Sequence, residues 1–229
     1  MRAVLLGAGY GTRLAPLTDR VPKILVPVEG EPLLARQLRY LAANGISEVA
    51  LNMHHLESRV RDYLATTRTP VPVRLYPEPE LLGTAGALRP MRALLDEPFV
   101  LLYGDVVTDL DLGDLASNHR GTATLSYYVA ANVEGKGVLE LDDDGCVVSF
   151  VEKPEAAAPG AVNAGIYALS PSILDLIPEG GDFGYDVWPH LVEAGELYGY
   201  RTDAYVADIG SLEMLRQVEN DVRNGVVQW

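Results

Sequence analysis

The chain has 229 residues, of which 48% are hydrophobic, and its formal net charge at pH 7 is −14. This length accommodates one large α/β domain or two small ones, and the acidic balance argues against nucleic acid as a partner, because phosphate backbones need a basic face. The single cysteine, Cys146, excludes an internal disulfide. The first residues lack the apolar core of a signal peptide, and no apolar run approaches ~20 residues, so we expect a cytoplasmic protein without a membrane partner.

A glycine-rich loop, residues 7–23, comes directly after the short apolar run Ala3–Leu6. Three glycines in five positions let the backbone approach a ligand closely and point successive N–H groups at it. Arg13 and Lys23 can then neutralise phosphate oxygens that amides alone cannot. The loop therefore predicts a site for a nucleoside triphosphate.

Other readings of this loop fit less well. A dinucleotide-binding turn needs the pattern G-x-G-x-x-G, and the sixth position here is Thr12. The P-loop pattern G-x-x-x-x-G-K-[ST] does not occur. A plain turn is disfavoured because residues 7–32 lack helix or strand periodicity, and aperiodic loops of more than about 12–15 residues in compact domains are usually functional or disordered. Prolines stiffen the loop at Pro16, Pro22 and Pro27, which argues against disorder.

The first half of the chain alternates strands and helices. Strands are predicted at Ala3–Leu6, Glu48–Asn52, Val71–Tyr76 and Phe99–Tyr103, and helices from Pro32 to Gly45, at Leu56–Leu64 and at Thr84–Leu95 with a break at Pro90. Strands separated by helices indicate right-handed βαβ units and a largely parallel sheet.

After about residue 120 the pattern changes to closely spaced strands. Strands are predicted at Thr122–Val129, Gly137–Leu141, Cys146–Glu152, Ala161–Leu169, Leu197–Tyr200 and Tyr205–Asp208, with a hairpin turn at Asp142–Gly145 and helices at Pro171–Ile177, Val187–Ala194 and Leu212–Asn224. We interpret the change as a second lobe, so that 1–229 is a single domain with lobes 1–120 and 121–229.

Two aspartates follow apolar strands and precede, or lie beside, a glycine. Asp105 follows Phe99–Tyr103, and Asp208 comes before Ile209 and Gly210. Ligands of open α/β sheets gather at the carboxyl ends of strands, and Mg²⁺ is usually held by one or two carboxylates plus substrate phosphates. Taken alone, each aspartate is more simply a turn residue. Together they predict a shared metal site.

Three further clusters offer ligand contacts. Glu152 and Lys153 end a strand and can hold hydroxyls and a phosphate, and Asn163 adds an amide suited to sugar hydroxyls. Glycines in Leu82–Gly86 let backbone groups meet a flat base edge-on. The four histidines show no metal-ligand spacing, and a solvated or capping role is expected for them.

In this order the clusters resemble the sugar-1-phosphate nucleotidylyltransferase family over nearly the whole chain. The matching motifs are Gly9–Leu14, Pro16–Thr18, Pro22–Lys23, Leu82–Gly86, Gly104–Asp105, Glu152–Pro154, Asn163–Gly165 and Asp208–Gly210. The chain looks most like mannose- or heptose-1-phosphate guanylyltransferases and is also similar to short N-acetylmuramate-1-phosphate uridylyltransferases. It departs from the family pattern at Ala8 and Ile24, where the family commonly has glycine and proline.

The resemblance implies a Rossmann-like α/β fold of the nucleotide-diphospho-sugar transferase type, with a mostly parallel central sheet and a smaller mixed β lobe. Residues 1–120 would bind the nucleotide, and residues 121–229 the sugar phosphate. The implied nucleotide contacts are Leu6, Gly7, Gly9, Gly11, Thr12, Arg13, Gly83 and Thr84, with Lys23 at the α-phosphate. The implied sugar-phosphate contacts are Gly137, Glu152, Lys153 and Asn163. Asp105 and Asp208 would hold Mg²⁺, for which Mn²⁺ can substitute, and with Arg13 and Lys23 they would be the catalytic residues.

The implied reaction joins a sugar 1-phosphate to an NTP and releases pyrophosphate by direct displacement at the α-phosphorus. GTP with a mannose- or heptose-type 1-phosphate is favoured, and UTP with a hexosamine-type 1-phosphate is the alternative. A non-catalytic nucleotide-sugar-binding regulatory subunit also stays open, although such a protein would be expected to lose one of the four catalytic charges. A dehydrogenase is disfavoured by Thr12, and homo-oligomer formation is left open.

Overall fold

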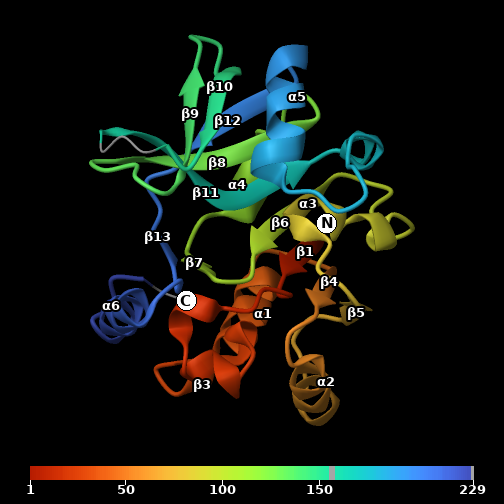
Figure 1. The fold of residues 1–229 in the computed structure, drawn as a ribbon, viewed down its shortest axis with the longest axis vertical. Helices are drawn as coiled ribbons and strands as arrows, with labels where there is room; N and C mark the ends of the chain where they lie inside the picture. The colour runs from red at the N-terminus through yellow and green to blue at the C-terminus, as the bar shows by residue number, and fades with distance from the viewer. Residues whose placement is uncertain (155–157, 228–229) are drawn as a thin grey trace. The chain divides into compact units, whose positions relative to one another are not determined.

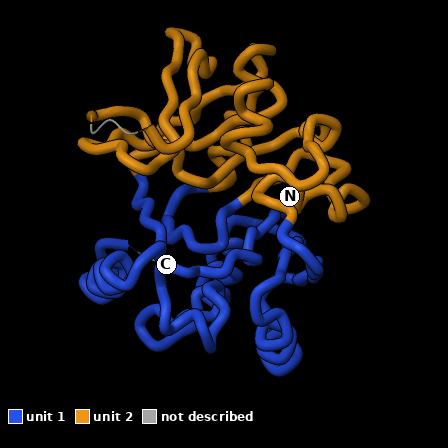
Figure 2. The backbone as a smooth tube through the Cα atoms, in the orientation of Figure 1, with its two compact units in different colours: residues 1–81, 102–111, 204–229 blue, residues 82–101, 112–203 orange. Residues whose placement is uncertain are grey.

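The computed structural model describes residues 1–154 and 158–227, which form two compact units (Figure 2). Unit 1 consists of Met1–Leu81, Leu102–Asp111 and Ala204–Trp229, and unit 2 of Leu82–Leu101 and Leu112–Asp203. This division differs from the lobes 1–120 and 121–229 expected from the sequence, because the chain passes from one unit to the other within strand β6 and again near residues 82, 112 and 204.

Unit 1 contains the strands and helices of the alternating half, together with the last helix of the chain (Figure 1). Its elements are β1 (Arg2–Leu6), β2 (Pro27–Val28), β3 (Glu31–Pro32), α1 (Leu33–Ala43), β4 (Glu48–Met53), α2 (Glu57–Thr66), β5 (Val73–Pro77), β7 (Val106–Thr108), β13 (Val206–Asp208) and α6 (Leu212–Arg223), with the end of β6 (Phe99–Tyr103).

In the sheet of unit 1, β1 pairs parallel with β4 and β4 pairs parallel with β5, and β6 is the neighbour of β1 on its other side. Leu5 lies opposite Leu51, and Leu51 lies opposite Leu75. Apolar side chains on both faces of β1 and β4 are buried, as expected for parallel strands covered on both sides. The predicted α/β class with a mostly parallel sheet is confirmed.

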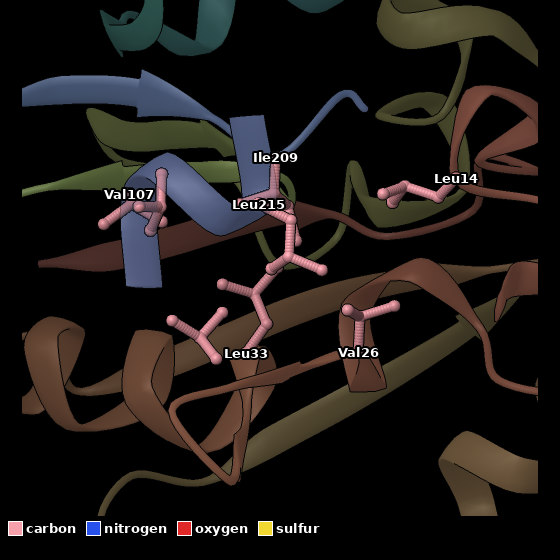
Figure 3. Packing of buried hydrophobic residues seen from close by; sticks show 8 residues of the cluster. Leu14, Val26, Leu33, Val107, Ile209 and Leu215 are labelled. Carbon is pink, nitrogen blue, oxygen red and sulfur yellow. The ribbon is translucent and has the colours of Figure 1, made fainter. Parts of the chain in front are cut away.

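A hydrophobic cluster holds α6 and the β7–β13 pair to the rest of unit 1 (Figure 3). Its buried members are Leu14, Val26, Val28, Leu33, Val107, Ile209, Leu215 and Val218. Leu14 and Val26 belong to the glycine-rich loop and its continuation, while Ile209 directly follows Asp208. The cluster therefore anchors loop residues and the end of β13 in one core.

Unit 2 is a mixed β layer with short helices. Its elements are α3 (Gly83–Gly86), the first part of β6, α4 (Leu112–Ser117), β8 (Ala123–Ala130), β9 (Gly137–Leu141), β10 (Val147–Glu152), β11 (Gly160–Leu169), a π-helix (Phe183–Val187), α5 (Trp188–Ala194) and β12 (Leu197–Arg201). Strand β11 pairs antiparallel with both β8 and β9, β10 pairs antiparallel with β9, and β12 pairs parallel with β8. No helix in the described ranges is long and apolar enough to span a bilayer.

Two segments differ in detail from their expected local structure. The stretch Thr84–Leu95, expected to be mostly helix with a break at Pro90, forms only the single turn α3 and a 3₁₀ turn at Arg89–Met91, because Gly86 as well as Pro90 interrupts it. The segment after Gly7 is more ordered than its lack of periodicity indicates. It contains 3₁₀ turns at Thr12–Leu14, Leu17–Asp19 and Lys23–Leu25 and the short β2–β3 hairpin.

Candidate functional site

The glycine-rich loop begins where β1 ends and is tied down at its start. The backbone N–H of Gly7 donates to Oδ1 of Asn52 at 2.7 Å, and Nδ2 of Asn52 donates to Oε1 of Glu78 at 2.7 Å. Asn52 and Glu78 are both buried. The carbonyl of Leu6 accepts from the N–H of Gly104 at 2.8 Å. Thus, the first loop residues are fixed by the ends of β4, β5 and β6.

A second set of contacts holds the middle of the loop. The Tyr10 hydroxyl lies 3.0 Å from Nε2 of His54, whose Nδ1–H donates to the Glu78 carbonyl at 2.7 Å. His55 Nε2–H donates to the carbonyl of Thr18 at 2.9 Å, and the Thr18 hydroxyl donates to the Gly11 carbonyl at 2.9 Å. The two histidines thus support the loop, while Gly9 and Thr12 stay exposed.

Charged side chains of unit 1 converge at the ends of β6 and β13. Lys23 forms an ion pair with Oδ2 of Asp105. Strand β13 pairs antiparallel with β7 so that Asp208 lies opposite Val106, which places it beside Asp105. The N–H of Ile209 donates to the Asp105 carbonyl at 2.9 Å. The two aspartates predicted to share a site are therefore neighbours, although 103 residues (208 − 105) separate them in sequence.

The environment of Asp208 combines burial with several charges. Burial and the negative charge of Asp105 raise the pKa of Asp208, and the N–H of Gly210, which donates at 2.8 Å, opposes this rise together with Lys23 and Arg13. Mutual repulsion between two carboxylates is relieved when a cation lies between them. The arrangement is therefore suited to a positive ligand.

The donor set of unit 1 fits a hard divalent cation. Carboxylate oxygens are the ligands that Mg²⁺ prefers, and Mg²⁺ typically takes one or two of them and completes its shell with water and substrate phosphates. Across residues 1–154 and 158–227, no group of three or more His, Cys, Asp and Glu side chains is positioned to hold a metal. Asp105 and Asp208 are accordingly the pair that could bind Mg²⁺ or Mn²⁺ with the help of a phosphate ligand.

Unit 2 brings together three of the four residues expected to meet a sugar phosphate. Gly137 lies opposite Glu152 where β9 pairs with β10, and a Cβ built on Gly137 would lie 3.0 Å from Oε2 of Glu152 and 3.4 Å from the Cβ of Asn163. The Asn163 side chain donates to the Tyr167 hydroxyl at 2.8 Å and accepts from the N–H of Gly165 at 3.0 Å. Its orientation is therefore fixed by its own strand.

Lys153, the fourth, has a strained backbone and an exposed side chain. Its φ of 52° lies in the left-handed region, which non-glycine residues adopt at an energetic cost and often at functional sites. Its N–H donates to the Lys136 carbonyl at 3.0 Å, while its Nζ lies 3.8 Å from Oε1 of Glu152. Burial raises the pKa of Glu152, Asp182 raises it further, and Lys153 lowers it. The exposed ammonium group of Lys153 thus lies beside the partly buried carboxylate of Glu152.

Gly83 and Thr84 lie in α3 of unit 2, where Thr84 is engaged by Asp182. The N–H and the hydroxyl of Thr84 both donate to Oδ1 of Asp182, at 2.9 and 3.0 Å.

Sequence reasoning missed Asp182, Asn52 and Glu78, because each acts through a partner distant in sequence. The only signals were that Asn52 and Glu78 are polar residues at predicted strand ends.

Known proteins are similar to this chain over most of its length. A family model described as Nucleotidyl transferase matches residues 2–225. The chain is 35% identical over 218 residues to a mannose-1-phosphate guanylyltransferase catalytic subunit beta from Drosophila pseudoobscura pseudoobscura, covering 91% of this chain and 59% of that protein. It is 32% identical over 235 residues to a UTP–glucose-1-phosphate uridylyltransferase from Synechocystis sp., covering 93% and 61%. The chain thus spans about three fifths of the length of these relatives.

Solved structures are similar along almost the whole chain. The crystal structure of HddC from Yersinia pseudotuberculosis complexed with GMP-PN superposes with a TM-score of 0.83 at 28% identity, covering 96% of this chain and 99% of that one. A putative glucose-1-phosphate thymidylyltransferase from Bacillus anthracis has a TM-score of 0.85 at 19% identity, covering 100% and 97%, and supports the fold alone.

Proposed function

The chain belongs to the nucleotidyl transferase family, and from that premise we propose that it transfers a nucleotidyl group from an NTP to a sugar 1-phosphate, releasing pyrophosphate. The observation that carries the proposal is the meeting of Lys23, Asp105 and Asp208 in unit 1, with Arg13 acting on Asp208. Two cations and two carboxylates at one place suit a triphosphate with its metal better than they suit a neutral ligand.

In this proposal the glycine-rich loop holds the nucleotide. Leu6, Gly7 and Gly9 would meet the nucleoside, Gly11, Thr12 and Arg13 the β- and γ-phosphates, and Lys23 the α-phosphate. The last assignment requires Lys23 to share its charge between Asp105 and the ligand. The fixed start of the loop supports its assignment to the nucleoside, because Asn52 holds Gly7 in place before any ligand binds.

Asp105 and Asp208 would hold a divalent cation, Mg²⁺ or Mn²⁺, against the phosphates. When bound, such a cation supplies positive charge that offsets the charge of the triphosphate and of its leaving group. Arg13 and Lys23 add to that neutralisation from the protein side.

The chemistry proposed is a single displacement. An oxygen of the sugar 1-phosphate forms a new bond to the α-phosphorus of the NTP as the bond from that phosphorus to the β-phosphate oxygen breaks, and that electron pair leaves with pyrophosphate. A sugar phosphate is already ionised at neutral pH, so the protein need not remove a proton. Its residues position the two phosphates and stabilise their charge.

Unit 2 would receive the sugar phosphate. Lys153 would bind the phosphate, and Glu152 with Asn163 would meet hydroxyls beside Gly137, where a side chain would crowd the Glu152 carboxylate. The exposed Nζ of Lys153 and the fixed orientation of Asn163 support these assignments.

For the base, we favour GTP with a mannose- or heptose-type 1-phosphate. The Drosophila relative is a guanylyltransferase, and the Yersinia structure was solved with GMP-PN. UTP is the second candidate, because the Synechocystis relative of similar identity is a uridylyltransferase.

The test is a comparison of kcat/KM for GTP, UTP, dTTP and ATP, each with mannose 1-phosphate and glucose 1-phosphate. We expect the highest value with GTP, because a site that hydrogen-bonds guanine leaves buried polar groups unpaired when a pyrimidine enters. A higher value with UTP or dTTP would overturn the choice of base and leave the reaction type standing.

A further inference from the structure

Two segments of unit 2 that are about a hundred residues apart in sequence are joined by a dense set of hydrogen bonds. The N–H groups of Ala85 and Gly86 donate to the Gly181 carbonyl at 2.9 and 3.0 Å, and the N–H of Gly181 donates to the Leu82 carbonyl at 2.9 Å. We call the two segments, Leu82–Gly86 and Gly181–Asp186, the clip. The first contains Gly83 and Thr84, for which the family resemblance implies contacts with the nucleotide.

Asp182 is the side chain that closes the clip. Its Oδ1 accepts from both the N–H and the hydroxyl of Thr84, and the Thr84 hydroxyl accepts from the N–H of Phe183 at 3.0 Å. A carboxylate that accepts two hydrogen bonds holds its donors more firmly than a neutral acceptor does. Thr84 is thus occupied by the protein, so its N–H and hydroxyl serve the clip.

The backbones of the clip approach so closely that side chains are excluded between them. Gly83 has a φ of +78°, and a Cβ placed on it would collide with the carbonyl oxygen of Gly181. An L-residue is disfavoured there both by its φ and by the space available. The glycine therefore permits the direct contact that Asp182 then secures.

The other end of the clip reaches the proposed sugar subsite. Asp182 precedes the π-helix Phe183–Val187, a rare conformation that occurs frequently at functional sites. A Cβ on Gly184 would lie only 2.6 Å from Oε2 of Glu152, so the π-helix packs its backbone against that carboxylate. Asp182 also lies close enough to raise the pKa of Glu152, after the larger effect of burial.

We propose that Asp182 is a positioning residue that makes the nucleoside-facing turn Leu82–Gly86 and the sugar-facing carboxylate Glu152 parts of one rigid piece. The proposal rests on the proposed function, with Glu152 at the sugar phosphate and the turn Leu82–Gly86 at the nucleotide, as the family resemblance implies for Gly83 and Thr84. It follows that loosening Asp182 disturbs both substrates at once, whereas loss of a residue that touches only one substrate disturbs that substrate alone.

The kinetic test compares Asp182→Ala with Asp182→Asn and Thr84→Val with Thr84→Ser. Asp182→Ala is expected to raise KM for both the NTP and the sugar 1-phosphate about tenfold or more, because two charge-assisted hydrogen bonds are lost. Asp182→Asn keeps an acceptor oxygen and is expected to restore most of both values. Thr84→Val should raise both KM values by a smaller factor, and Thr84→Ser, which keeps the hydroxyl, should raise both less than Thr84→Val does. The matched control is Asp175→Ala, which removes an exposed carboxylate of the same unit.

A rise confined to one KM, or an Asp182→Asn protein as impaired as Asp182→Ala, would overturn the proposal. If Asp182→Ala fails to fold, the Thr84→Val and Asp182→Asn proteins decide the question by the same criterion.

Hydrogen–deuterium exchange gives a readout that does not depend on turnover. In Asp182→Asn, and more strongly in Thr84→Val or a folded Asp182→Ala, amides of Leu82–Gly86 and Gly181–Asp186 should exchange faster together. Faster exchange in only one segment would contradict the clip. A parent protein without turnover on any substrate pair, but with coupled exchange in the variants, would instead refute the proposed function.

Discussion

At the scale of single residues, the proposed chemistry depends on charges that the fold of unit 1 concentrates. Lys23 pairs with Asp105, and Asp208 lies beside Asp105 because of the register between β7 and β13. Burial, and after it the negative charge of Asp105, raises the pKa of Asp208. Sites that carry perturbed carboxylates of this kind are often functional, since a fold gains no stability from bringing such groups together.

Removal of either carboxylate should abolish most activity without unfolding the protein. Asp105→Asn and Asp208→Asn are each expected to lower kcat by about 10²–10³, the scale seen when an electrostatic stabiliser is removed. Excess EDTA should abolish the activity of the parent, and Mg²⁺ or Mn²⁺ should restore it. Steady-state kinetics beside thermal melting provide the measurement, with the exposed Asp143→Asn as the control.

Full activity in EDTA, or in the Asp105→Asn protein, would show that the two aspartates do not form a metal site. The sequence singled out these two residues because each lies at the end of an apolar strand, Asp105 directly after Gly104 and Asp208 two residues before Gly210. Their proximity was not predictable, because it depends on the pairing of β7 with β13, and β7 (Val106–Thr108) is too short to show a pattern.

At the scale of elements, the glycine-rich loop is a supported structure. The ends of β4 and β5 hold it through Asn52 and Glu78, and His54 and His55 engage Tyr10 and Thr18. The lack of periodicity in residues 7–32 indicated a special loop, but the side chains that support it were not predictable. Each support depends on a hydrogen bond to a residue distant in sequence, whereas local patterns report only neighbours three or four positions away.

Asn52 should be the residue on which the start of the loop depends. Asn52→Ala leaves the half-buried Gly7 N–H and the buried Glu78 carboxylate without the amide that joins them, so it is expected to lower the free energy of unfolding by about 1–3 kcal/mol. It should also raise KM for the NTP more than KM for the sugar phosphate, because the loop belongs to unit 1. Denaturant unfolding and two-substrate kinetics measure these effects, and Asn118→Ala, an exposed asparagine of unit 2, is the control. An unchanged KM for the NTP would separate the Asn52 contact from nucleotide binding.

Strands with a clear apolar pattern were predicted more accurately than segments that contain helix breakers. The strands Phe99–Tyr103 and Gly137–Leu141 are found with the expected bounds, because continuous or alternating apolar runs specify strands strongly. The Thr84–Leu95 segment is less helical than expected, since two helix breakers outweigh the apolar spacing. The segment instead begins with the turn Gly83–Gly86, which hydrogen-bonds to Gly181 and Asp182. These partners are about a hundred residues away in sequence, so the contact could not be predicted from local patterns.

At the scale of the whole molecule, two compact units carry complementary parts of the proposed reaction. Unit 1 supplies the glycine-rich loop and the paired aspartates, while unit 2 supplies Lys153, Glu152 and the clip. Membership of the nucleotidyl transferase family supports the proposed reaction class, and the relatives, one named a guanylyltransferase and one a uridylyltransferase, leave the choice of base to experiment.

The most direct test is pyrophosphate release by the purified protein supplied with GTP, mannose 1-phosphate and Mg²⁺, with each component omitted in turn. The account predicts release only when all three are present, in a one-to-one ratio with the nucleotide sugar formed. Binding of nucleotide and sugar phosphate without pyrophosphate release from any NTP and sugar 1-phosphate pair would contradict it, and would identify the chain as a regulatory nucleotide-sugar-binding protein.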